Sequence, residues 1–91
     1  NMVNLSGCSF AGSSFENVDF SSSDLSRADF SYSILVKNEL VNTNLTGADL
    51  RYADIRNLDI TKIDLTGVLI NEDQQSGLLE EIGMIVCQTK D

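Results

Sequence analysis

The chain has 91 residues and a formal net charge of −8 at pH 7, from 14 acidic and 6 basic side chains, which fits one small domain. Its hydrophobic fraction of 42% is too high for a disordered acidic tail. An acidic surface disfavours direct binding to nucleic acid or to anionic membranes, so we expect a partner that carries positive charge. No apolar run approaches the roughly 18 residues of a membrane helix and no signal-peptide pattern is present, so we expect a cytoplasmic protein.

The sequence lacks the residues that most enzymes use. It has no histidine, which removes the ordinary acid–base and Ser–His pairs, and it has no P-loop. Its two cysteines, Cys8 and Cys87, form no CxxC motif. The stretch from Asn71 to Ile82 superficially resembles a calcium loop, but glycine falls at its seventh position and isoleucine at its twelfth. We therefore expect no catalysis, no cofactor and no metal site.

A period of five residues begins near the first residue and continues to Ile70. Every fifth residue from Leu5 onward is Leu, Ile or Phe, and the residue two before it is mostly small or aliphatic. Neither a helix, with a period near 3.6, nor a strand, with a period of 2, explains this spacing. Two inward and three outward residues per repeat indicate a solenoid. The central positions are Leu5, Phe10, Phe15, Phe20, Leu25, Phe30, Leu35, Leu40, Leu45, Leu50, Ile55, Ile60, Leu65 and Ile70.

The stretches GADL at 47–50, YADI at 52–55 and RADF at 27–30 resemble the A(D/N)LXX motif of the pentapeptide-repeat family. This resemblance covers residues 3–70 and is specific, because the motif recurs in fourteen successive repeats. It implies an all-β solenoid, a right-handed quadrilateral β-helix in which four pentapeptides make one coil of twenty residues. Residues 1–70 would then form about three and a half coils, stacked about 4.8 Å apart.

A coil of twenty residues predicts which side chains stack. Phe10, Phe30, Leu50 and Ile70 would form one inner column, and Tyr32 would stack on Tyr52 at one corner. Two inward positions that prefer alanine carry larger polar residues, each of which needs a backbone hydrogen bond if it is buried. These are Asn38 and Thr43. Three apolar residues would instead form a small spot on the surface, namely Ile34, Val36 and Val41.

The period ends after Ile70, and residues 71–91 follow other rules. Asn71 and Gln74 resemble a capping box, and Gly83 is a natural helix stop, so we predict a helix over about 72–82 and a short extended segment over 84–87. The last coil of a solenoid needs a cap, which this tail can supply. It holds more apolar residues than a cap needs, which predicts a dimer interface. Its residues are Leu78, Leu79, Ile82, Met84, Ile85 and Val86.

Residues 57–86 also resemble the C-terminal end of the Qnr-type quinolone-resistance proteins. The shared pattern is an acidic turn followed by spaced residues that the pentapeptide rule does not dictate. They are Gln74, Ser76, Leu78, Leu79, Glu80, Ile82, Gly83 and Val86. The resemblance implies a symmetric dimer through this module. Qnr-type proteins are considerably longer and several carry loops between coils, which are absent here, so we expect the chain to be the C-terminal part of a longer protein.

Eight carboxylates lie immediately before central residues. They are Asp19, Asp24, Asp29, Glu39, Asp49, Asp54, Asp59 and Asp64. Asp or Asn is the family consensus there and can bond the turn backbone, which is a purely structural interpretation. Asn would serve equally without charge, so repeated Asp and Glu also predict rows of negative charge along a rod.

Resemblance to the Qnr-type proteins implies that this rod mimics DNA. It would bind the DNA-gripping surface of DNA gyrase or topoisomerase IV and protect these enzymes from quinolones. A related hypothesis is protection of gyrase against a peptide toxin of the same host. An alternative of a different class is a structural or scaffolding solenoid whose protein partner is unrelated to topoisomerases.

Overall fold

The backbone turns a corner every five residues. The computed structural model describes residues 3–56, 58 and 63–87. Two positions after a central residue, φ is positive, as at Arg27 with 57° and Gly47 with 73°. At most of these corners the next N–H donates to the central carbonyl, as Ala28 does to Leu25 at 3.1 Å. A positive φ at the third residue favours glycine, yet most of these corners carry other residues. Non-glycine corners are Asn17, Ser22, Arg27, Tyr32, Lys37, Asn42 and Tyr52.

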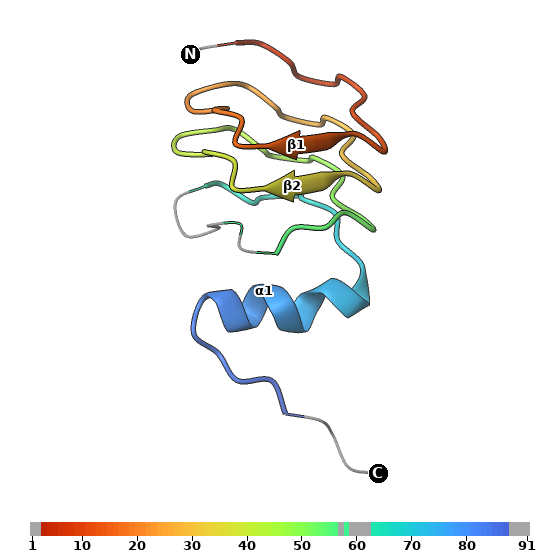
Figure 1. Ribbon diagram of the computed structural model, residues 1–91, viewed down its shortest axis with the longest axis vertical. Helices are drawn as coiled ribbons and strands as arrows, with labels where there is room; N and C mark the ends of the chain where they lie inside the picture. Colours follow the sequence, from red (N-terminus) through yellow and green to blue (C-terminus); the bar gives the residue numbers. More distant parts are fainter. Residues whose placement is uncertain (1–2, 57, 59–62, 88–91) are drawn as a thin grey trace.

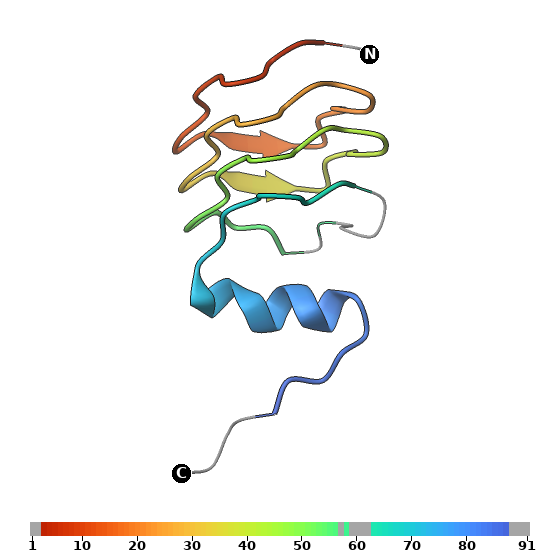
Figure 2. The same cartoon turned by 180° about the vertical axis from the view of Figure 1, so that it is seen from behind.

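Successive coils pair in parallel, with residues twenty apart opposite each other. The Leu25 N–H donates to the Asn44 carbonyl at 2.8 Å, and the Asp24 N–H donates to the Val3 carbonyl at 2.8 Å. In the described part of the chain, β1 (Ser14–Glu16) and β2 (Ile34–Val36) are the segments with regular strand structure, and they pair in parallel with Ser14 opposite Ile34. The coils lie one above another, with β1 directly over β2 (Figures 1 and 2). The predicted stacking period of twenty is therefore confirmed.

The central residues close an apolar core inside the coils. Phe30 and Leu25 are each only 1% exposed. Phe10 and Phe30 stack with ring centroids 5.1 Å apart, as their shared column predicts, and Phe15 packs edge-on against both. Burial falls toward the ends of the stack, where Ile70 is 36% exposed. At roughly 1.5–3 kcal/mol per buried large side chain, these columns supply most of the stabilisation.

Asn38 and Thr43, at inward positions, make the expected backbone hydrogen bonds. The Val18 N–H donates to Asn38 Oδ1 at 2.8 Å, and Asn38 Nδ2 donates to the Phe15 carbonyl at 3.1 Å. At other corners the equivalent N–H and carbonyl bond each other directly. Here the Asn38 side chain bonds both groups instead. Thr43 Oγ1 is buried and donates to the Phe20 carbonyl at 2.8 Å.

Two predictions for the outward positions are also confirmed. Tyr32 and Tyr52 stack at one corner, with ring centroids 4.8 Å apart and planes 13° apart. Ile34 and Val41 have exposed side chains, while Val36 is half-buried.

The tail begins with a short 3₁₀ helix, η2 (Glu72–Gln74), followed by α1 (Gln75–Glu81). Figure 1 shows α1 lying beneath the last coil. This agrees with the predicted helix over 72–82. Gly83 ends it with φ of 94°, while its N–H donates to Glu80 and the Met84 N–H donates to Leu79, the two bonds of a Schellman motif. Residues 84–87 form neither helix nor strand.

Two side chains at the start of the tail replace a further coil. The Tyr32 N–H donates to the carbonyl of Arg51 in the next coil, whereas the Tyr52 N–H donates to Asn71 Oδ1 at 2.6 Å. Gln74 Nε2 donates to the carbonyls of Leu50 at 2.9 Å and Ala53 at 3.0 Å. Its Oε1 accepts the Asn71 N–H at 2.7 Å, as in the predicted capping box. The tail thereby satisfies the Tyr52 N–H and the carbonyls of Leu50 and Ala53.

The molecule measures 47 × 23 × 22 Å along its principal axes, with the stack of coils along the long axis (Figure 1). None of the helices in the described ranges is long and apolar enough to cross a bilayer.

Two matched substitutions at inward positions test this packing. Ser33 Oγ is buried without a hydrogen-bond partner, at a position where the next coil carries Ala53, so Ser33→Ala should raise the free energy of unfolding by about 1 kcal/mol. Thr43→Ala removes the bond to the Phe20 carbonyl and should lower it by roughly 1–2 kcal/mol. Urea denaturation of both variants measures the difference. Equal losses for the two variants would show that the inward assignment is wrong.

Candidate functional site

Carboxylates before the central residues hold the corner turns. Asp24 Oδ1 accepts the Ser26 N–H at 3.0 Å, and Asp64 Oδ1 accepts the Thr66 N–H at 3.0 Å. Asn44 Oδ1 accepts the Thr46 N–H at 3.1 Å in the same way, and Asn4 accepts the Ser6 N–H at 3.1 Å. Where this position carries Asp or Asn, a side-chain oxygen therefore caps the turn, and an uncharged amide supplies it as well as a carboxylate does. The corner at Lys37 forms after Ile34 without such an oxygen.

The carboxylates are held in their ionised form. Side-chain and backbone hydrogen bonds from Ser21 lower the pKa of Asp19, and those from Ser26 lower the pKa of Asp24. Hydrogen bonds from Thr66 likewise lower the pKa of Asp64. Each of these groups consequently carries a full negative charge at neutral pH.

Two of the eight predicted carboxylates are neutralised within their own repeat. Arg51 Nη2 lies 2.8 Å from Asp49 Oδ2, with Nε donating to Oδ1 at 3.0 Å. Arg56 pairs with Asp54 in the same two-bond arrangement, at 2.7 and 2.9 Å. The sequence signal is arginine two residues after aspartate. These two ion pairs remove Asp49 and Asp54 from the predicted rows of free negative charge.

Five of the predicted residues keep their charge without an ion pair in the part of the chain that the structure describes. They are Asp19, Asp24, Asp29, Glu39 and Asp64. The eighth, Asp59, lies outside the described residues. Among the described residues, no group of three His, Cys, Asp or Glu side chains is arranged to hold a metal ion.

The unpaired carboxylates fall mainly into two columns that we term the acidic columns. Asp19 bridges to Glu39, and Asp24 bridges to Asn44 and through it to Asp64. The two columns belong to consecutive repeats, so they are neighbours around the coil. Asp19 and Glu39 lie about one strand spacing apart, at which like charges repel, whereas Asn44 separates Asp24 from Asp64. Repulsion along the first column therefore opposes the stabilisation that the turn hydrogen bonds give to the charged form of Asp19.

The tail presents the second surface. Ile85 is 87% exposed and Met84 is 55% exposed, while Ile82 and Val86 are each nearly half exposed. Two other residues of the predicted dimer interface are less accessible. Leu78 packs against the core of its own chain, and Leu79 is half-buried. The exposed apolar surface therefore lies on the last turn of the helix and the segment beyond it.

Sequence comparison identifies the repeats. The family model described as "Pentapeptide repeats" matches eight copies over residues 3–37 and 39–67. The chain belongs to the pentapeptide-repeat family. A search among curated proteins found no significant match.

This pentapeptide-repeat chain is similar in structure to QnrB1, described as a plasmid-mediated fluoroquinolone resistance protein. One trypsin-treated QnrB1 variant matches with a TM-score of 0.64 and 26% identity, over 93% of this chain and 45% of QnrB1. Full-length QnrB1 matches with a TM-score of 0.62 and 26% identity, over 89% of this chain and 43% of QnrB1. The chain spans less than half the length of these QnrB1 structures. The predicted resemblance to the Qnr-type proteins is confirmed.

Proposed function

We propose that this pentapeptide-repeat chain is a non-catalytic DNA mimic of the cytoplasm. It binds the DNA-gripping surface of a type II topoisomerase, DNA gyrase or topoisomerase IV, and protects the enzyme from quinolones. One observation carries the proposal: Asn4 and Asn44 make the same turn bonds as the aspartates, so the charge of the acidic columns is not needed for folding. The similarity to QnrB1, a fluoroquinolone resistance protein, supports this choice of partner.

The charge distribution suits a basic partner surface. A topoisomerase grips DNA with a basic saddle, which would attract a negative rod by the same electrostatics that attract phosphates. The chain carries a net charge of −8, and Asp19, Asp24 and Asp64 are fixed by their turn bonds. Carboxylates that are already oriented lose little side-chain freedom on binding, which favours affinity.

The length of the rod bears on how it could replace DNA. We propose that residues 1–70 form about three and a half coils of a right-handed quadrilateral β-helix, which would span only roughly 17 Å at one strand spacing per coil. One turn of DNA spans about 34 Å. Two copies joined end to end at their C-termini would double the rod and place acidic columns on both arms.

We propose that residues 71–91 serve both as the cap of the last coil and as the dimerisation module. The capping part consists of Asn71, Gln74 and Leu78, which contact the coil above. The exposed side chains of Ile82, Met84, Ile85 and Val86 would form the twofold interface, because a twofold axis brings the same apolar patch of both chains together.

Two double variants test whether gyrase binding depends on where the negative charges lie or only on the net charge. Asp19→Asn with Asp24→Asn should weaken binding to gyrase and reduce the salt dependence of that binding. The matched control, Asp49→Asn with Asp54→Asn, removes the same charge from carboxylates that arginines already neutralise, and should bind nearly as the parent does. Surface plasmon resonance across a salt series measures both variants.

Equal losses of affinity in the two double variants would show that net charge alone acts. Unchanged binding by the Asp19 and Asp24 variant at low salt would contradict DNA mimicry through these columns. It would favour the alternative of a scaffolding solenoid with an unrelated protein partner.

The second prediction concerns the dimer. Ile85→Asp with Val86→Asp places charges on exposed side chains that the fold of one chain does not use, so the variant should fold but remain monomeric. Light scattering should give a dimer for the parent and a monomer for the variant, with equal thermal unfolding of the coil region. A monomeric parent would exclude this interface.

A further inference from the structure

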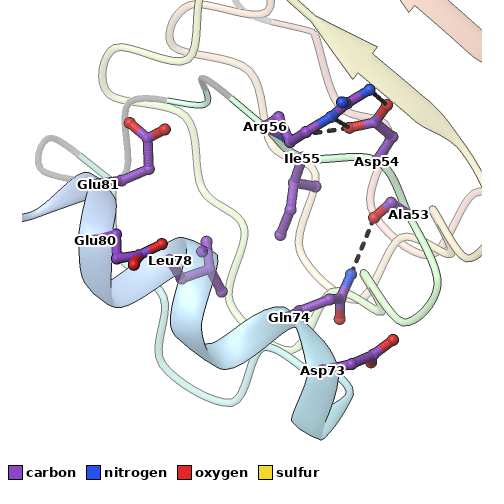
Figure 3. A pocket seen from close by; sticks show the side chains of 10 residues that line it. Ala53, Asp54, Ile55, Arg56, Asp73, Gln74, Leu78, Glu80 and Glu81 are labelled. Carbon is purple, nitrogen blue, oxygen red and sulfur yellow. Dashed lines mark hydrogen bonds and ion pairs between the residues drawn. The ribbon is translucent and has the colours of Figure 1, made fainter. Parts of the chain in front are cut away.

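A pocket of about 610 Å³ lies between the last coil and helix α1. The coil contributes Ala53 to Arg56, and the tail contributes residues from Asp73 to Glu81 (Figure 3). Its volume lies within the roughly 300–1,000 Å³ of small-ligand pockets. The apolar tail segment beyond Ile82 does not line it, so the pocket is separate from the proposed dimer interface.

The floor of the pocket is apolar. Ile55 is 7% exposed and Leu78 is half-buried, and Figure 3 shows their side chains pointing toward each other across the space between coil and helix. Gln74 crosses one end of this space to donate to the Ala53 carbonyl at 3.0 Å. The coil and the helix are thus fixed relative to each other, and the floor is preformed.

The rim of the pocket is acidic, formed by Asp73, Glu80 and Glu81. None of the three has an ion pair within the described ranges, because the nearby arginine, Arg56, is held by Asp54 at 2.7 Å. Glu80 and Glu81 lie in the last turn of α1, which contains no basic residue. Negative charge at a helix C-terminus is unfavourable, so the helix itself does not account for these two residues.

Gly77 keeps the pocket open from the helix side. It lies inside α1, where glycine is among the least favourable residues, and a Cβ added to it would meet no atom within 4 Å. Close packing therefore does not require a glycine here. Because Gly77 lines the pocket, a larger side chain at this position would extend into open space beside the helix.

We propose that this pocket binds a basic side chain, lysine or arginine, presented by a protein partner. The alkyl stem would lie on Ile55 and Leu78, and the cationic head would reach Glu80 and Glu81 at the rim. A long amphipathic side chain fits this arrangement because it buries its stem while its charge remains near solvent and carboxylates. This inference stands independently of the topoisomerase proposal, since the pocket uses none of the acidic columns.

Two soluble probes that differ only in the ammonium group test the inference. Nα-acetyl-lysine amide carries the stem and the charge, while Nα-acetyl-norleucine amide carries the stem alone. In NMR titrations of the isotope-labelled 91-residue chain, the lysine probe should shift the Gly77 amide and the methyl groups of Ile55 and Leu78 in a saturable manner. The norleucine probe should bind about tenfold more weakly. Equal binding of the two probes, or no shifts with the lysine probe, would overturn the proposal.

Two double variants distinguish the effect of the rim carboxylates on probe binding from the effect of overall charge. Glu80→Gln with Glu81→Gln should abolish the preference for the lysine probe. Glu16→Gln with Glu72→Gln removes the same charge from exposed glutamates that do not line the pocket and should leave that preference intact. Equal effects of the two variants would overturn a site at the rim.

A last variant separates binding from stability. Gly77→Leu should raise the melting temperature by stabilising α1 and should abolish the saturable shifts by filling the pocket. Its Ile55 and Leu78 methyl resonances report on the floor directly. Binding of the lysine probe to this variant with the affinity of the parent would overturn the assignment of the pocket.

Discussion

The backbone hydrogen bonds that pair positions twenty apart in successive coils determine the rest of this structure. They set the register in which Asp24 lies opposite Asn44 and Phe10 lies over Phe30. Once that register is set, each outward position of one coil stacks on the same position of the next. A residue type that recurs at one repeat position therefore forms a column on the surface. Aspartates at that position form a column of negative charge. Repeat proteins of this kind depend on such contacts between neighbouring units.

The corner turn explains why this surface is free to carry charge. Where Asp or Asn precedes the central residue, one side-chain oxygen accepts an N–H two residues on, as at both Asn44 and Asp64. The second carboxylate oxygen and the charge remain available to a partner. Where an arginine follows two residues later, as at Arg51 and Arg56, it forms an ion pair with the aspartate and neutralises its charge. The positions of the arginines therefore decide which columns of the rod remain negative.

The sequence allowed the fold to be predicted wherever one repeat dictates the next. The central residues, the stacking of Tyr32 on Tyr52 and the backbone bonds of Asn38 and Thr43 all follow from the period. Contacts that depend on the reach of a long side chain could not be read in this way. They include the pairing of Arg51 with Asp49, and the bonds of Gln74 to two carbonyls more than twenty residues before it. The direction of Leu78, which packs inward, depends on how α1 docks, and no repeat encodes that.

The most direct test is thermal unfolding of two triple variants. It asks whether the turns depend on the side-chain oxygen of the aspartates and not on their negative charge. One variant replaces Asp19, Asp24 and Asp64 with asparagine, and the other replaces the same three residues with alanine. The account predicts that the asparagine variant at pH 7 matches or exceeds the melting temperature of the parent, because its turn bonds persist and repulsion falls. The alanine variant should unfold at a clearly lower temperature. If the asparagine variant unfolds as early as the alanine variant, the charge itself holds the turns, and the acidic columns are explained by folding alone.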